Sequence, residues 1–412
     1  MKKKLLSVAL SLSVVLGLSA CNMPWNSDNT RKKENSSINI NTDSSSGNSN
    51  EDLLDDDDVN AKIDEINSYI DSYFYFDIDR DKQEEALYDG IMEGLDDPYS
   101  VYYTKEEYEE LMEEDSGEYV GVGAVVTQDE SMRVTVVRPI PNSPAEEAGL
   151  MAEDQIIEVD GTEITDQELS LVVDMIRGEE GTTAHIKVYR AGESDYLEFD
   201  IPRRVVENYS VYSEMLDDNI ALIQVQQFYD NTPKEFEEAI EKAISDGAEG
   251  LIFDLRDNPG GLLNAVTEMC DYIMGEGTIV TVEDRDGRVM NDYESDEEQQ
   301  INMPMVVLVN GNSASASEIF TGALKDSGKA TIVGTTTFGK GIVQSVIPLS
   351  DGTAIKITIA KYFTPNGTDI HTIGIEPDYV VELADGRKNA VNLPHDEDTQ
   401  LDKAIEIINS EK

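Results

Sequence analysis

The chain has 412 residues, and its 85 aspartates and glutamates outnumber its 31 lysines and arginines, which gives a formal net charge of -54. A chain of this length exceeds one ordinary domain, so we expect about two to four modules. Because a strongly anionic surface is repelled by phosphate groups, the charge excludes nucleic acid as a natural partner.

Residues 1–20 have the composition of a secretory signal. Lys2-Lys3-Lys4 precedes an apolar run from 5 to 18, which is too short for a stable membrane span. The segment Leu18-Ser19-Ala20-Cys21 resembles the lipobox of bacterial lipoproteins. This resemblance implies cleavage before Cys21, lipidation of its sulfur and an extracytoplasmic protein that is lipid-anchored to the bacterial cell membrane. An ordinary secreted protein is the alternative.

Residues 21–58 are rich in serine, asparagine and aspartate and end in four consecutive aspartates, so we expect a disordered acidic tether. From 59 to 115 apolar residues recur at helical spacing between turns such as Asp97-Pro98, which indicates a helical module. The segment from Gly94 to Tyr102 has no catalytic pattern of its own. Packing or dimerisation is the role that we expect for it.

Residues 116–204 change to short β-branched runs, which predict strands at 120–126, 134–137, 156–159, 185–189 and 197–201 and helices at 143–150 and 166–176. The pattern Gly121-Val122-Gly123-Ala124, followed by Ser143-Pro144-Ala145 and Ala148-Gly149-Leu150, resembles a PDZ domain. The resemblance implies that the amides of Gly121 to Ala124 bind the terminal carboxylate of a peptide, which adds as a strand beside them.

Residues 205–385 alternate strands and helices, which predicts an α/β domain with a largely parallel sheet. We expect strands at 220–226, 251–255, 305–310, 330–334, 342–348 and 354–364, and helices at 232–245, 260–274 and 315–327. Residues 386–412 form a tail with one short helix at 399–408. Cys270, in the apolar pattern of its helix, is expected to be a buried structural thiol, and lipidation of Cys21 would leave it without a disulfide partner.

Ser315 and Lys340 are the candidate nucleophile and base. Ser315 follows a strand and begins a helix, where free amides and the helix dipole favour a developing oxyanion. Lys340 can activate a serine only if its amine is uncharged. Its neighbours Phe338 and Ile342-Val343 predict apolar surroundings that would favour this form. Gly339 and Gly341 allow other backbone to approach closely. Because serines alternate with alanines here, Ser313 and Ser317 remain possible by this reasoning alone.

Two sources of oxyanion donors are expected. The N–H of Ala316 is the first, because it follows Ser315 at the start of the helix. The second must come from another loop, and residues 255–261 qualify because they follow a strand and contain Gly260 and Gly261. Of these two glycines we favour Gly261.

The combined motifs resemble the carboxy-terminal processing peptidases of family S41, tail-specific serine proteases with a Ser/Lys dyad. The resemblance covers nearly the whole mature chain and includes Asp-Pro-Tyr-Ser at 97–100, the PDZ pattern, residues 254–261, Ser-Ala-Ser-Ala-Ser-Glu at 313–318 and Phe-Gly-Lys-Gly at 338–341. In this family the serine lies 25 residues before the lysine. That interval, 340 minus 315, selects Ser315.

The resemblance also implies a PDZ domain inserted between the helical module and a protease core of the ClpP/crotonase type. Gln344, four residues after Lys340, would orient the lysine amine through its side-chain carbonyl. The two side chains can meet if a strand begins at Lys340, because residues i and i+4 of a strand share a face. No cofactor or metal is required. Substrates would be proteins or peptides with accessible C-termini, Arg177 would couple the PDZ domain to the active site, and a homodimer is expected.

Other classes of serine enzyme fit less well. A Ser-His-Asp hydrolase would need one of His185, His371 or His395, of which only His371 is plausible, and no Gly-x-Ser-x-Gly motif occurs. A penicillin-recognising enzyme would need Ser-x-x-Lys, which is also absent from the sequence. A lipid-anchored PDZ adaptor with a degenerate, inactive protease domain is the non-enzymatic alternative. Such an adaptor would be expected to lack Ser315 or Lys340, and both residues are present.

Overall fold

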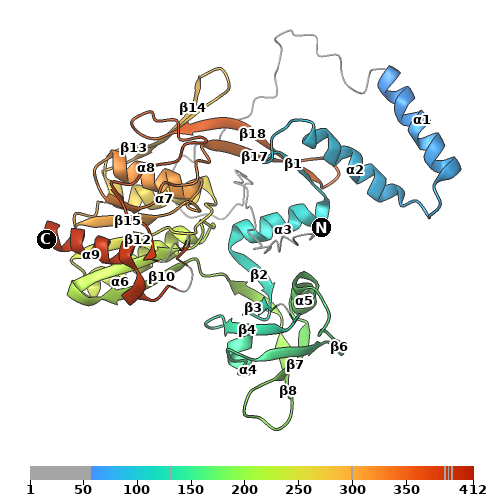
Figure 1. Cartoon of the computed structure of the whole chain (residues 1–412), viewed down its shortest axis with the longest axis horizontal. Helices are drawn as coiled ribbons and strands as arrows, with labels where there is room; N and C mark the ends of the chain where they lie inside the picture. The colour runs from blue at the N-terminus through green and yellow to red at the C-terminus, as the bar shows by residue number, and fades with distance from the viewer. Residues whose placement is uncertain (1–56, 130, 298–299, 385–386, 388, 391–392) are drawn as a thin grey trace, which may run out of the picture.

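The computed structural model describes residues 57–129, 131–297, 300–384, 387, 389–390 and 393–412. The predicted signal, Cys21 and almost all of the predicted tether lie outside these residues. The described chain has three parts, an N-terminal helical arm, a small β-rich domain and a larger α/β domain (Figure 1). None of the described helices is long and apolar enough to span a bilayer.

The N-terminal arm agrees with the predicted helical module and adds one strand. Its elements are α1 (Asp57–Tyr73), α2 (Arg80–Glu93), β1 (Val101–Tyr103) and α3 (Lys105–Ser116). Thr104 and Glu107 form a capping box that starts α3. Strand β1 pairs with a strand of the α/β domain, β18 (Ala354–Phe363). The arm therefore contributes directly to the larger domain.

The β-rich domain leaves and returns to the rest of the chain through one two-stranded ribbon. Strand β2 (Glu118–Gly121) pairs antiparallel with β9 (Arg204–Glu207). Between them lie β3 (Ala124–Gln128), β4 (Val134–Pro139), α4 (Pro144–Ala148), β5 (Gln155–Val159), β6 (Thr162–Glu163), α5 (Leu169–Ile176), β7 (Thr183–Tyr189) and β8 (Leu197–Pro202). The sheet order is β3-β4-β5-β7-β8, so β3 has a free edge.

Two predicted elements of this domain differ from the structure. The predicted strand 120–126 is two strands in different sheets, because the chain breaks at Gly123, whose φ is +80°. The predicted helix 166–176 begins only at Leu169. The apolar face of α5 packs onto the sheet through Val172 and Ile176, so the domain has its own core.

The larger domain has two sheets. Its elements are β10 (Val211–Leu216), the 3-10 turn Asp217–Asn219, β11 (Ile220–Val225), α6 (Thr232–Ser245), β12 (Gly250–Asp254), α7 (Leu263–Met274), β13 (Gly277–Glu283), β14 (Val289–Ser295), β15 (Met305–Val309), α8 (Ala316–Asp326), β16 (Thr331–Gly334), β17 (Ile342–Pro348), β18, β19 (Tyr379–Val380), the 3-10 turn His395–Glu397 and α9 (Thr399–Glu411). The sheet β10-β11-β12-β15-β16-β19 is parallel except at β10. The antiparallel sheet comprises β1, β18, β13 and β14, with β17 paired to β18.

Both faces of the parallel sheet are covered, which explains its uninterrupted apolar strands. On one face, Phe236 of α6 and Phe320 of α8 pack edge to face, and both contact Phe253 of β12. Helix α9 covers the other face with residues such as Leu401. Cys270 on α7 is fully buried, as predicted, and burial raises the pKa of its thiol.

The structure places the ends of two adjacent parallel strands beside one another. Strand β12 ends at Asp254 and leads into the loop 255–261, while its neighbour β15 ends at Val309 and leads to Ser315. Helix α7 was predicted from 260 but starts at Leu263, so Gly260 and Gly261 remain in the loop. Carboxyl ends of neighbouring parallel strands are the usual location of sites in open α/β sheets.

Candidate active site

Ser315 lies at the start of α8 in an unusual backbone conformation. Its φ of 56° and ψ of -114° fall outside the regions that serine usually adopts. The residue is only 2% exposed, and its Oγ has no hydrogen-bond partner. Backbone strain of this kind costs roughly 1–3 kcal/mol and persists only where the surroundings hold it. The structure thus holds one buried, unpaired hydroxyl at a helix N-terminus.

The two neighbouring serines have structural partners. Ser313 Oγ donates to the Leu255 carbonyl over 2.7 Å and accepts from the amide of Asn310. Ser317 Oγ donates to the carbonyl of Asn258 over 3.0 Å. Both serines therefore fasten the 255–261 loop to the start of α8. Of the three candidates, Ser315 alone keeps its hydroxyl free of such bonds.

Lys340 lies in the turn before β17 and is 5% exposed. Burial, and then the positive charge of Lys356, lower the pKa of its amine to about 8, while Asp97 and Glu318 oppose the shift. Phe338 contributes little to this burial, because it is 54% exposed, contrary to our expectation. Ile342 is buried as expected.

The glycines beside Lys340 are required by close backbone contact. A Cβ on Gly339 would lie 2.9 Å from the amides of Ile373 and Gly374, and one on Gly341 would lie 2.7 Å from the amide of His371. Loop 370–374 therefore packs directly onto this turn. The prediction that these glycines permit close backbone approach is confirmed.

Glu318 and Tyr362 connect the backbones of Ser315 and Lys340. The carboxylate of Glu318, fully buried, accepts the Ser315 amide over 2.9 Å and the Lys340 amide over 2.8 Å. It also accepts from Thr337 Oγ1 and the Gly339 amide. The buried Tyr362 hydroxyl lies 3.0 Å from the Ser315 carbonyl and also reaches that of Lys340. Both residues thus fix the relative position of the two candidates, and sequence reasoning did not identify either.

The hydroxyl of Tyr362 supplies the first testable prediction. We expect Tyr362→Phe to lower kcat by about tenfold with little change in KM, because the hydroxyl that lies between two buried carbonyls is lost and the Ser315–Lys340 spacing relaxes. Steady-state kinetics on a peptide substrate would measure this effect. Tyr293→Phe, in the same domain on β14, should leave kcat unchanged. An unaltered kcat in Tyr362→Phe would show that the hydroxyl has no positioning role.

The predicted oxyanion loop packs against Ser315. A Cβ on Gly260 would lie 2.8 Å from the Ser315 Cβ and 3.0 Å from the Ala316 nitrogen, so no larger residue fits there. The Gly260 amide is already bonded to Asn258 Oδ1 over 2.9 Å. The amide of Gly261 has no such bond among the described residues, which favours Gly261 over Gly260 as a donor. The assignment of Ala316 and Gly261 remains a prediction.

Gln344 does not contact Lys340 in the way that we expected. Strand β17 begins at Ile342, so Lys340 lies outside it, and the pairing with β18 shifts between Val343 and Gln344. The rule that residues i and i+4 share a face therefore does not apply. Gln344 Nε2 donates to the carbonyl of Tyr99, while its Oε1 is buried without a partner.

The segment 97–100, for which we expected only packing or dimerisation, lies beside Lys340. The Lys340 Nζ is 4.6 Å from the centre of the Tyr99 ring. Asp97 accepts hydrogen bonds from Ser100 and from Thr358 of β18. No local signal in the sequence pointed to this contact, because 241 residues (340 minus 99) separate Tyr99 from Lys340.

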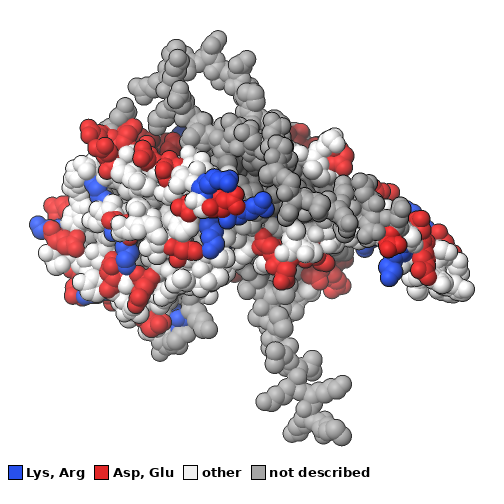
Figure 2. Space-filling model, turned by 90° about the horizontal axis from the view of Figure 1, so that it is seen from above, with Lys and Arg blue, Asp and Glu red and all other residues white. Residues whose placement is uncertain are grey.

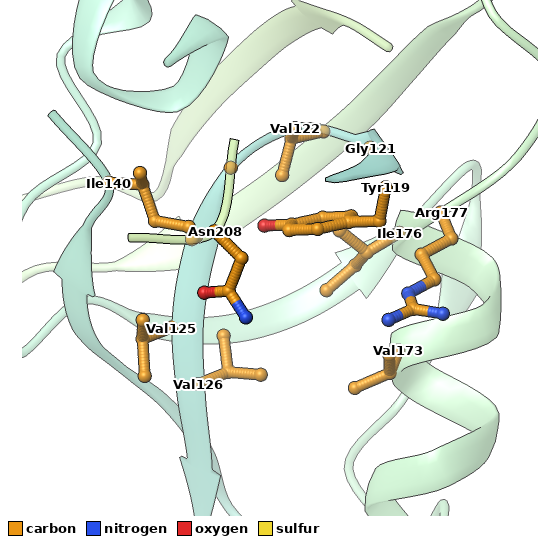
Figure 3. A pocket seen from close by; sticks show the side chains of 12 residues that line it. Tyr119, Gly121, Val122, Val125, Val126, Ile140, Val173, Ile176, Arg177 and Asn208 are labelled. Carbon is orange, nitrogen blue, oxygen red and sulfur yellow. The ribbon is translucent and has the colours of Figure 1, made fainter. Parts of the chain in front are cut away.

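A pocket in the β-rich domain contains the predicted carboxylate-binding residues. Gly121, Val122, Gly123 and Ala124 line it together with Arg177. Figure 3 shows the ring of Tyr119 inside this pocket, with the Arg177 guanidinium beside it at 5.2 Å from the ring centre. Arg177 also pairs with Glu113 of α3 over 3.3 Å, so it connects this domain to the N-terminal arm.

The remaining charged groups include a buried cluster, in which Arg256 pairs with Asp254 over 2.7 Å and with Asp398 over 2.8 Å. Acidic side chains are spread over the face seen in Figure 2, with fewer basic ones among them. His371 packs its backbone against Gly341, and its Nδ1 is buried without a partner. Within the described ranges, no group of three histidine, cysteine or acidic side chains could hold a metal ion.

Comparisons with known proteins agree with this arrangement. The sequence profile of peptidase family S41 matches residues 219–381, and a PDZ profile matches 135–190. The carboxy-terminal processing protease CtpA of Bacillus subtilis is 38% identical over 334 residues, which cover 80% of this chain and 71% of that protein. A carboxyl-terminal-processing protease of Synechocystis is also 38% identical, with 73% of this chain and 72% of the other covered. A solved structure from Bacteroides fragilis, described as an S41 protease, shares the fold with a TM-score of 0.52 at 18% identity, covering 77% of this chain and 87% of the other.

Proposed function

The chain belongs to peptidase family S41 and is a serine-type peptidase with a PDZ domain ahead of its protease domain, and from this premise we propose that it processes proteins from their C-termini. Ser315 is the nucleophile and Lys340 the general base of this proposal. The observation that carries it is the unpaired, buried hydroxyl of Ser315. Glu318 accepts hydrogen bonds from the backbone amides of both Ser315 and Lys340, and the pKa of Lys340 is lowered to about 8. At that pKa a substantial fraction of the amine is neutral near pH 8.

Acylation begins with the neutral amine. Lys340 takes the proton of Ser315 Oγ as this oxygen bonds to the peptide carbonyl carbon. The carbonyl oxygen becomes an oxyanion, to which the amides of Ala316 and Gly261 donate. The carbon–nitrogen bond then breaks, and the ammonium of Lys340 returns its proton to the leaving amine.

Deacylation repeats the sequence with water. Neutral Lys340 takes a proton from the water that attacks the acyl-enzyme, and Ser315 leaves with that proton as the product acid forms. Ser315 and Lys340 share no hydrogen bond in the structure, and bonds of this kind are often completed only in the substrate complex. Gln344 Oε1, buried and unpaired, is a ready acceptor for the Lys340 ammonium in that complex.

The PDZ domain supplies selection of C-termini in this proposal. A peptide adds beside the free edge of β3 and places its carboxylate on the amides of residues 121–124. Arg177 lies on the same pocket and adds a positive charge for that carboxylate. Through its pair with Glu113, Arg177 also links peptide binding to α3, which supports the proposed regulatory role.

The test compares two fluorogenic peptides of one sequence, which end in a free carboxylate or in an amide. We expect the amidated peptide to be cleaved with a kcat/KM about tenfold lower, and Arg177→Ala to reduce this preference. Arg133→Ala, which removes an exposed arginine of the same domain, is the matched control and should keep the preference. Equal cleavage of both peptides would refute C-terminal selection and leave the Ser/Lys chemistry intact.

Tethering and assembly complete the proposal. The lipobox-like segment at Cys21 supports lipid anchoring outside the cytoplasm. Metabolic labelling with a fatty acid tests this, and the label should be lost in Cys21→Ala.

A homodimer is supported by α1 and the turn after it, which expose aromatic side chains including Tyr73, Phe74, Tyr75 and Phe76. Polar substitution of Tyr75 and Phe76 should halve the mass in light scattering if a second copy covers this surface.

A further inference from the structure

The segment Asp97-Pro98-Tyr99-Ser100 of the N-terminal arm lies against the candidate base. Tyr99 presents two groups to the site, its ring to the Lys340 amine at 4.6 Å and its carbonyl to the Gln344 side-chain amide. The ring is half-buried and covers one side of the amine. The arm therefore contributes a wall of the site that the protease domain does not provide by itself.

Hydrogen bonds fix this segment to the protease domain. Asp97 Oδ2 accepts from Thr358 Oγ1 over 2.7 Å and from Ser100 Oγ over 2.6 Å. The Thr358 amide donates to Ser100 Oγ over 3.1 Å. Thr358 is the direct cross-strand neighbour of Gln344 in the β17–β18 pairing. The position of Tyr99 is thus set from the same point of the sheet that carries Gln344.

The contact with Gln344 determines how its amide points. Because the Tyr99 carbonyl can only accept, it binds the nitrogen of the Gln344 amide and leaves Oε1 as the free group. A buried oxygen without a partner is costly, so an ammonium that reaches it forms a strong bond. Tyr99 in this way prepares an acceptor for the lysine ammonium.

We propose that Tyr99 is a positioning residue of the active site, which excludes water from the Lys340 amine with its ring and orients Gln344 with its carbonyl. This inference rests on the proposed Ser/Lys mechanism and extends it to the N-terminal arm. The charged groups that face Lys340 are Asp97 from the segment itself, Glu318 from α8 and Lys356 from β18, with His371 near Asp97. None of these charges is removed when Tyr99 is replaced.

The ring has two opposing effects on the lysine. Its face attracts an ammonium group, which favours the charged form of Lys340. Its bulk keeps water away, which favours the neutral form, and burial is the largest cause of the lowered Lys340 pKa. We therefore expect loss of the ring to raise the pKa of Lys340.

The test is the pH profile of kcat/KM for Tyr99→Ala. We expect the acidic limb of the profile, near pH 8 in the parent, to move up by about one pH unit. The variant should therefore have a kcat/KM about tenfold below that of the parent at pH 7.5, and this difference should largely disappear above about pH 9.5. Tyr99→Leu, which restores apolar cover, should return the limb toward pH 8. Thr358→Val, which loosens the segment without touching Tyr99, should reproduce part of the shift.

Tyr102→Ala is the matched control, because its ring packs on Tyr88 of α2 in the same arm. It should leave the profile unchanged. A Tyr99→Ala profile that falls equally at every pH, or a limb that moves down, would overturn the proposal. Either result could occur while Ser315 and Lys340 remain essential, so failure of this inference is distinguishable from failure of the mechanism.

Discussion

Replacing Ser315 with alanine is expected to abolish peptide cleavage. In the proposed mechanism Ser315 is the residue that forms the acyl-enzyme, so kcat should fall by roughly 10⁴-fold or more, as it does when a nucleophile of this type is removed. Binding of the substrate C-terminus should persist, because Ser315 is not among the residues that line the PDZ pocket. The measurement is turnover of a fluorogenic peptide together with binding of the same peptide to the variant.

The serines of the same region separate catalysis from structure. Ser313→Ala and Ser317→Ala each remove one bond to the 255–261 loop, so we expect partial losses that accompany a lower melting temperature. Ser327→Ala, at the far end of α8, should be neutral for cleavage. Cleavage that survived in Ser315→Ala would contradict the assignment of the nucleophile.

Replacing Lys340 with methionine should remove almost as much activity. The side chain keeps its length but cannot take a proton, so we expect a fall in kcat of about 10²–10⁴-fold. In the parent protein, kcat/KM should rise with pH through a limb near pH 8. Only the neutral amine of Lys340 can accept the serine proton, and the pKa of this amine is about 8. This limb should vanish from the residual activity of Lys340→Met.

Stability distinguishes this loss from misfolding. A buried amine is costly to charge, so the melting temperature of Lys340→Met at neutral pH should equal or exceed that of the parent. Lys361→Ala, on β18 with an exposed pair to Asp369, is the control and should keep both the rate and the limb. A parent profile without a limb between about pH 7 and 9 would contradict a neutral lysine base.

The strands and helices that position the candidate site could be predicted from the sequence because their signals are local. The strand 305–309 is a continuous apolar run, and the small residues after it mark the turn into α8. Glycines at 260, 339 and 341 similarly mark backbone approaches that the structure contains. The hairpin of β13 and β14 was not predicted, since polar residues interrupt the apolar ones in both strands and β14 is partly exposed.

The partners of Ser315 and Lys340 could not be predicted, because they depend on contacts that no local pattern records. Glu318 reads as an ordinary first-turn acid of α8, and only the fold brings Gly339 and Lys340 to its carboxylate. Tyr362 reads as one aromatic of a strand. The expectation that a strand begins at Lys340 was wrong, because β17 begins two residues later and its pairing shifts, while the role of Gln344 stays a prediction. Register details of this kind follow from packing.

Mass spectrometry of the acyl-enzyme tests the central claim most directly. The full chain is mixed with a peptide substrate, quenched in acid within the first turnover, digested and searched for the acyl group. We predict an adduct on Ser315 whose rate of formation rises through pH 8 in the parent and is lost in Lys340→Met. An adduct on any other residue, or formation on Ser315 that does not depend on Lys340, would contradict the account.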